Sequence, residues 1–127
     1  MILRAMPRRA RWLLLAWAMA ADSHADVAAK AGPDSAAARG AAIFSKYCVL
    51  CHGADARGDG VAARSLDPRP ANLRRSALSS AQKETIIRNG GGGVGRSPSM
   101  PPWREELDER QIADLLTYLS TLKSAAK

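Results

Sequence analysis

Apolar residues recur at helical spacing near the C-terminal end of the chain. They fall every three or four positions and would form one stripe along a helix: Ile112, Leu115, Leu116, Leu119 and Leu122. Asp108 can cap the first turn of this helix, and Gln111 can complete a capping box. Leu107 would then pack against Ile112 as a hydrophobic staple. This segment is the clearest helix that the sequence predicts.

A second helix is predicted just before the pair of cysteines. Asp34 or Ser35 can cap it, and it would end near Tyr47. Its expected inner face consists of Ala37, Ile43, Phe44 and Tyr47. Gly40 lies inside this helix, where a glycine costs about 1 kcal/mol relative to alanine. That glycine is either simply tolerated or required by a close helix crossing.

The chain between these two helices predicts loops and one short helix. Residues 53–70 contain a Gly-Asp-Gly turn signal and two prolines, so they are predicted to form a loop. Ser79 can cap a short helix, with Gln82 three residues later, that ends at Asn89-Gly90. The glycine run that starts there lacks the Gly-Lys-Ser/Thr ending of a phosphate-binding loop and is predicted to be a flexible loop. No segment alternates like a strand, so the predicted fold class is all-α.

The N-terminal segment has the pattern of an export signal. Four arginines precede the apolar run 12–21, and this order is typical of a secretory signal peptide. The run is too short to span a bilayer, which needs about 20 apolar residues. Ser23 and Ala25 supply the small residues for cleavage after position 25, and the stretch 18–20 offers an alternative cleavage site. We therefore expect residues 1–25 to be a cleaved signal peptide.

Removal of this peptide changes the composition of the chain. Four arginines and one aspartate leave with it, so the net charge falls from +7 to +4 and a nucleic-acid partner becomes less favoured. The product is predicted to be a periplasmic protein with a flexible lead-in at 26–34 and one domain at 35–127. It keeps one histidine, one methionine and four aromatic residues, which is a thin supply of large core side chains. Another group is therefore expected to fill part of the interior.

Cys48-Val49-Leu50-Cys51-His52 is the attachment pattern of c-type haem. At this spacing, near the end of a helix, the thiols can form thioethers with the vinyl groups on one edge of the porphyrin. The histidine that follows then lies beneath the ring and can ligate iron. Other interpretations are weaker: a redox pair lacks its strand–helix context, a zinc site lacks ligands, and a disulfide across so short a loop stabilises little. One covalently attached haem c is the predicted cofactor.

The second axial ligand of the iron follows by elimination. His52 is the only histidine after position 25, so a second histidine ligand is excluded if cleavage occurs there. Met100 is the only methionine after position 25, and enough chain separates it from His52 to pass around the ring. Three prolines within residues 98–102 restrict its loop. The alternatives are a gap-filling core methionine, ligation by a lysine, or an empty sixth site.

Together these features resemble the class I cytochrome c family. The resemblance covers about residues 36–122 and depends on the Cys-x-x-Cys-His motif, on Met100 before a proline, and on a helix at either end. In that family the first helix carries a glycine followed four residues later by an aromatic, which corresponds to Gly40 and Phe44. An aromatic from the last helix, here Tyr118, packs across them. The resemblance thus implies that Gly40 makes room for a crossing helix.

The resemblance also implies roles for residues near the haem. A proline carbonyl is expected to accept the proton of the second ring nitrogen of the axial histidine, and either Pro68 or Pro70 fits this role. Trp103 resembles the aromatic that follows the axial methionine in the family. It is expected either to contact the ring or a propionate, or to be a core aromatic.

By resemblance, the chain is a monomeric single-haem electron carrier rather than an enzyme. Cys48, Cys51, His52 and Met100 would bind the haem, and its iron would cycle between Fe(III) and Fe(II). Its partners would be redox proteins met over small interfaces. Basic residues near the haem segments either steer acidic partners or are ordinary solvated charge: Lys46, Arg57, Arg64, Arg69, Arg96 and Arg104. The alternatives are a dedicated cytochrome subunit of a periplasmic oxidoreductase and a gas or redox sensor with a labile Met100.

Overall fold

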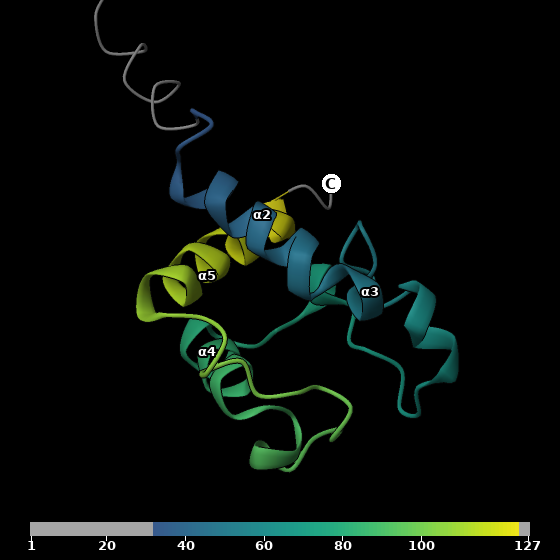
Figure 1. Cartoon of the computed structure of the whole chain (residues 1–127). Coiled ribbons are helices and arrows are strands. Elements are labelled where there is room, and N and C mark those ends of the chain that lie inside the picture. Colours follow the sequence, from purple (N-terminus) through teal and green to yellow (C-terminus); the bar gives the residue numbers. More distant parts are fainter. Residues whose placement is uncertain (1–31, 125–127) are drawn as a thin grey trace, which may run out of the picture. The chain divides into compact units, whose positions relative to one another are not determined.

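The computed structural model describes residues 32–124 of the chain. Its α-helices are α2 (Ala36–Tyr47), α3 (Val49–His52), α4 (Ser80–Asn89) and α5 (Glu109–Ser124) (Figure 1). Short 3-10 helices connect them: η1 (Val61–Ser65), η2 (Leu73–Arg75) and η3 (Gly92–Val94). No strand occurs among residues 32–124, and the prediction of an all-α fold is confirmed. The predicted signal peptide and residues 26–31 lie outside the described residues.

Helix α2 begins and ends where the sequence predicts. Ser35 is its N-cap, because the Ser35 side chain accepts a hydrogen bond of 3.2 Å from the backbone N–H of Ala38. The predicted inner face is correct in its centre, where Phe44 is buried. Ile43 and Tyr47 are half-buried and pack against the core. The helix therefore presents Gly40 and Phe44 to the interior.

The predicted capping box of helix α5 is present in full. The backbone N–H of Asp108 donates to Gln111 Oε1 at 2.9 Å, and the N–H of Gln111 donates to Asp108 Oδ1 at 2.8 Å. Leu116 alone of the predicted apolar stripe is only half-buried. The other four residues of the stripe are buried, and so is Leu107, as the predicted hydrophobic staple requires. The buried cluster consists of eight residues: Phe44, Ala56, Ile87, Leu107, Ile112, Leu115, Leu119 and Leu122.

Helix α4 also has its predicted capping box. The N–H of Gln82 donates to Ser79 Oγ, and the N–H of Ser79 donates to Gln82 Oε1. The segments on either side of α4 that were predicted to be loops are not irregular throughout. They contain the 3-10 helices η1 before α4 and η3 after it. Such turns need only bonds between residues three apart, so they form in short segments without a strong sequence pattern. In η1 and η3 these bonds join Ala63 N–H to Gly60 O at 2.9 Å and Val94 N–H to Gly91 O at 3.2 Å.

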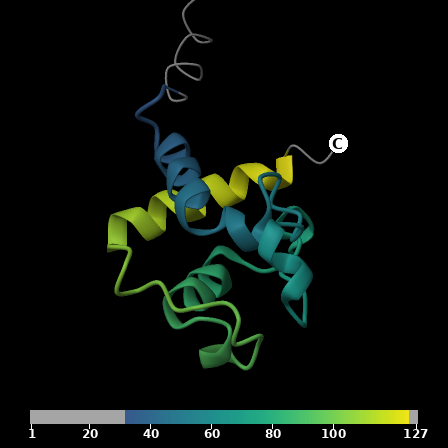
Figure 2. The ribbon, with the colours of Figure 1, turned by 45° about the vertical axis from the view of Figure 1, so that its right-hand side comes forward.

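Helices α2 and α5 cross each other (Figure 2). Their closest approach lies at Gly40, against Asp114 and Tyr118. A Cβ atom on Gly40 would overlap the carbonyl oxygen of Asp114 and lie 2.8 Å from Cβ of Tyr118. The backbones thus approach more closely than any side chain would permit. The rings of Phe44 and Tyr118 pack beside this point with their centroids 5.4 Å apart. The expectation of a close crossing at Gly40 is therefore confirmed.

An ion pair that the sequence pattern did not predict joins the same two helices. Arg39 Nε and Nη2 donate to the two carboxylate oxygens of Asp114 at 2.6 and 2.8 Å. This two-pronged geometry is the strong form of an arginine–carboxylate contact. The hydrogen bond from Arg39 lowers the pKa of Asp114, although the burial of the carboxylate opposes the shift. Asp114 is thus a buried carboxylate that Arg39 keeps ionised.

The crossing predicts that Gly40→Val destabilises the protein. Its larger side chain must push α5 away, and overpacking of this kind costs about 1–3 kcal/mol or more of unfolding free energy. Ala42→Val is the matched control, because Ala42 is exposed on the same helix. Denaturant unfolding of the two haem-loaded variants measures the difference. Equal unfolding free energies for both variants would contradict the importance of the crossing.

The ion pair predicts a specific pH dependence of stability. Because the folded pKa of Asp114 lies below its ordinary value, the ionised carboxylate stabilises the fold above the ordinary aspartate pKa of about 3.9. This contribution is lost as the pH falls through the lowered folded pKa. Asp114→Asn should therefore lower Tm at pH 7 and flatten the decrease of Tm in acid. Asp55→Asn, at an exposed carboxylate 4.0 Å from Arg57, should alter neither.

Candidate haem site

The two cysteines lie on a single helical turn that directly follows α2. Cys48 ends α2, where its N–H donates to the carbonyl of Phe44 at 2.9 Å, and it also precedes α3. The carbonyl of Cys48 then accepts from Cys51 N–H at 3.3 Å and from His52 N–H at 2.9 Å. Residues three apart on a helix share one face, so the two thiols are neighbours. Both are half-buried free thiols.

The environment of Cys48 does not favour thiolate chemistry. Burial raises the pKa of the Cys48 thiol to about 12, and the neighbouring Cys51 adds to the shift. Catalytic redox cysteines have a lowered pKa in an electropositive setting. The raised pKa of Cys48 is the opposite of this, so it gives no support to the interpretation of the motif as a thioredoxin-like pair.

His52 is fixed by a backbone carbonyl that the sequence did not identify. Its Nδ1 lies 3.1 Å from the carbonyl oxygen of Ala71. Because a carbonyl only accepts, Nδ1 carries the proton and Nε2 presents a free lone pair. Burial lowers the pKa of the His52 imidazole, while the bond to Ala71 opposes this shift. The result is a half-buried imidazole with a defined tautomer, as metal ligation by a histidine requires.

The expectation that Pro68 or Pro70 would accept this proton is wrong. The carbonyl of Pro70 faces Gly58, where a Cβ atom would overlap the Pro70 oxygen. Gly58 is in turn held to the motif, because its N–H donates to the carbonyl of His52 at 2.8 Å. Carbonyls of neighbouring residues in such a loop point in different directions, so the next residue, Ala71, is the one that meets the imidazole.

Met100 lies in a short loop that packs on the buried cluster. Its side chain is half-buried there, as is that of Cys48, so the structure brings these two predicted haem-binding residues to the same core. Trp103 is half-buried, and its ring meets that of Tyr47 edge-on, with the centroids 5.4 Å apart. Since Tyr47 immediately precedes Cys48, this contact links the two segments that carry the predicted ligands. Its packing supports the interpretation of Trp103 as a core aromatic.

The remaining predicted features lie on the surface. All six basic residues singled out in the sequence are exposed: Lys46, Arg57, Arg64, Arg69, Arg96 and Arg104.

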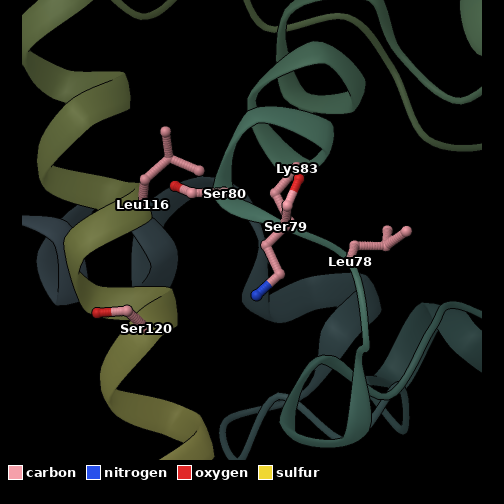
Figure 3. A pocket seen from close by; sticks show the side chains of 6 residues that line it. All are labelled: Leu78, Ser79, Ser80, Lys83, Leu116 and Ser120. Carbon is pink, nitrogen blue, oxygen red and sulfur yellow. The ribbon is translucent and has the colours of Figure 1, made fainter.

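A cleft of about 190 Å³ lies between the start of α4 and α5 (Figure 3). Its lining consists of Leu78, Ser79, Ser80, Lys83, Leu116 and Ser120. None of these is a predicted iron ligand, so this cleft is separate from the candidate haem site.

The described residues also limit the alternatives for metal binding. Within them, no three histidine, cysteine or acidic side chains are grouped closely enough to hold a metal ion. The two cysteines and His52 therefore do not themselves form such a group, and a zinc site has no support in this part of the chain. Haem iron needs only two axial ligands from the protein, and the sequence predicts His52 and Met100 for these positions. Within the same residues, no helix has both the length and the apolar character to cross a membrane.

Comparison with known proteins decides the family. The family model of cytochrome c oxidase, cbb3-type, subunit III matches residues 35–119, which is well over half of the chain. The chain belongs to this family of c-type cytochromes. Membership implies a covalently bound haem c and a role in electron transfer. No curated protein matches this cytochrome significantly.

A solved structure is similar to this cytochrome over the same fold. It belongs to the reducing HAO-like protein complex of Kuenenia stuttgartiensis, is 27% identical and superposes with a TM-score of 0.57. The match covers 66% of this cytochrome and 41% of the other chain. This cytochrome thus corresponds to about two fifths of the length of that chain.

The residues present fit a haem c. The candidate groups are the thiols of Cys48 and Cys51, the imidazole of His52, whose Nδ1 is bonded to Ala71 while Nε2 can bind a metal, and the half-buried thioether of Met100. Thiols form the covalent links, while imidazole and thioether are the axial ligands found in cytochromes c. The carbonyl of Ala71 accepts a hydrogen bond from Nδ1 of His52, and a bond of this kind orients a histidine that binds a metal through its other nitrogen.

Proposed function

We propose that this cytochrome is an exported electron carrier with one haem c, attached through Cys48 and Cys51 and ligated by His52 and Met100. The geometry of His52 carries the proposal. Its imidazole follows the paired thiols on the same helical turn, and the bond from Nδ1 to Ala71 leaves Nε2 available for iron. The neutral imidazole that burial favours is the form that binds a metal.

The proposed chemistry is outer-sphere electron transfer without bond making. Haem, when bound, supplies an iron that is stable as Fe(II) and Fe(III). His52 and Met100 would both hold the iron, and this would leave no coordination position open to a substrate. A thioether ligand and an apolar surround both favour the ferrous state and raise the potential. Phe44, Ile87 and Leu107 belong to the buried cluster that would form this surround.

We also propose that the carrier works in the periplasm. The support is the order of arginines, apolar residues and small residues in positions 1–25, which is typical of a secretory signal peptide. Covalent attachment of haem to a Cys-x-x-Cys-His motif agrees with an extracytoplasmic location. The domain would then comprise residues 35–127, act as a monomer, and exchange electrons with protein partners of acidic surface through its exposed basic side chains.

A dedicated subunit of an oxidoreductase complex is the second candidate. Two observations favour it: the family is named for a subunit of an oxidase, and the similar solved chain belongs to a protein complex. Leu50 and Val61 are 59% and 77% exposed and could be covered by a permanent partner. Size-exclusion chromatography with light scattering on the protein purified from its source decides between the two. A carrier elutes with the molar mass of a single chain, whereas a subunit elutes with the molar mass of its complex.

Replacing both cysteines by alanine tests the covalent link. The double variant Cys48→Ala, Cys51→Ala should carry no haem after denaturation and organic extraction, since no thioether holds it. It should also fail to unfold cooperatively, because small domains have only about 5–15 kcal/mol of stability to lose. Leu50→Ala is the control, since Leu50 lies in the same motif but is exposed. A cooperatively folded variant without haem would contradict the expected role of haem in the core.

Substitution of Met100 tests the axial ligand. The ferric wild type should show the weak red charge-transfer band of an iron–sulfur bond, and Met100→Ala should lose it completely. The variant should also bind carbon monoxide when reduced and have a lower potential, because thioether sulfur favours ferrous iron. Met100→His should stay six-coordinate and also fall in potential.

Ser99→Ala is the matched control for Met100→Ala, because Ser99 is exposed in the same loop. It should keep the band and the potential of the wild type. An unchanged band in Met100→Ala would rule out Met100 as ligand. A wild type that readily binds carbon monoxide would instead favour the sensor interpretation.

A further inference from the structure

The loop that carries Met100 is attached to the C-terminal end of α4. The last turn of that helix leaves carbonyls without helical partners, and the carbonyl of Ile87 accepts from Trp103 N–H at 2.8 Å. Gly90 caps the helix with a φ of 71°, a conformation that favours glycine. The chain then turns so that Gly91 N–H donates to the carbonyl of Met100 at 2.8 Å. These bonds hold the chain on both sides of Pro101 and Pro102.

Gly91 also holds the other end of the same loop. Its carbonyl accepts from Arg96 N–H at 2.7 Å, so one peptide segment is bonded to both ends of residues 96–100. The remaining bonds of the loop are internal and longer, such as Met100 N–H to Ser97 O at 3.3 Å. They stiffen the loop but do not fix it against the rest of the fold. Among the backbone hydrogen bonds of residues 96–100, those to Gly91 are therefore the ones that attach the Met100 loop to the end of α4.

The contact leaves no room for side chains at Gly90 and Gly91. A Cβ atom on Gly91 would overlap the carbonyl oxygen of Ser97 and lie 3.2 Å from Cβ of Met100. A Cβ atom on Gly90 would lie 2.8 Å from both Met100 O and Pro102 N. Both glycines are buried. Relieving either overlap requires the backbone of the loop to move.

The neighbouring Gly92 differs from this pair. It is exposed, and a Cβ atom there would lie 3.5 Å from Cα of Pro98, which is an ordinary van der Waals contact. A substitution at Gly92 changes the same glycine run without displacing the loop. The close approach is thus confined to Gly90 and Gly91, at the point where α4 meets the Met100 loop.

We propose that Gly90 and Gly91 are positioning residues for Met100. By holding the backbone of the Met100 loop, they determine whether the thioether stays on the haem iron. The inference rests on the proposed ligation by Met100. A ligand set must be held within about 0.5 Å of its working geometry. A side chain at Gly91 moves the loop beyond this tolerance, while the crossing of α2 and α5 and the attachment turn at Cys48–His52 lie outside the overlap. The sulfur is released and the fold persists.

The test compares Gly91→Ala with Gly92→Ala in the haem-loaded protein. Gly91→Ala should lose at least half of the iron–sulfur charge-transfer band and bind carbon monoxide when reduced, with covalent haem and helical circular dichroism retained. Gly92→Ala should match the wild type in all of these. A full band in Gly91→Ala, without carbon monoxide binding, would overturn the proposal. A wild type that lacks the band would show instead that the proposed Met100 ligation is wrong.

A measurement on the wild type decides the matter even if Gly91→Ala does not fold. Coupling between two sites is reciprocal, so release of the sulfur must loosen the bond between Gly91 and Met100. Cyanide binds ferric iron and displaces a thioether ligand. In the cyanide adduct the amide of Gly91 should exchange its hydrogen at least tenfold faster than in the free ferric protein, whereas that of Leu119 in α5 should not change. Equal exchange at Gly91 in both forms would refute the positioning role.

Discussion

The close approach of α2 and α5 at Gly40 governs how the rest of this cytochrome is arranged. Because no side chain separates the backbones there, the carboxylate of Asp114 comes within hydrogen-bond distance of Arg39, and Tyr118 packs on Phe44. The crossing fixes the direction in which α2 ends, and the cysteines begin at that end. The orientation of the haem-attachment turn thus follows from a contact between helices that carry no haem ligand.

Backbone groups, rather than side chains, orient the candidate iron ligands. The carbonyl of Ala71 selects the tautomer of His52, while the N–H of Gly91 holds the segment of Met100. Backbone donors and acceptors have fixed positions once the chain is folded, so each ligand loses little further freedom on binding. This arrangement suits a carrier, whose site should change little between its two oxidation states. It also explains why glycines stand at positions 90 and 91, where the backbone meets the Met100 loop directly.

The packing around the site links its two halves through aromatic contacts. Tyr47 precedes the cysteines and Trp103 follows Met100, and their rings meet edge-on. A shift of one segment is thereby felt by the other. Phe44 is the only aromatic residue of the buried cluster in the described part of the chain, and half of that cluster consists of leucine and isoleucine of α5. Membership of the cytochrome c family, with its covalent haem, accounts for a core of this kind in so short a chain.

Local patterns in the sequence were sufficient to predict α2, α4 and α5, their caps and the Cys-x-x-Cys-His motif, but not α3 or the 3-10 helices. The caps at Ser79 and Asp108 act within one helical turn. The stripe from Ile112 to Leu122 extends over about three turns, and its members are three or four residues apart, so neighbouring residues specify it. The candidate ligands could be named for a different reason, because the chain offers few histidines and methionines to choose from. Only the tertiary structure decided that Ala71 meets His52, that Arg39 pairs with Asp114 and that Gly91 holds Met100. These contacts join residues distant in sequence, and which carbonyl or amide faces the site depends on backbone angles that no residue type encodes.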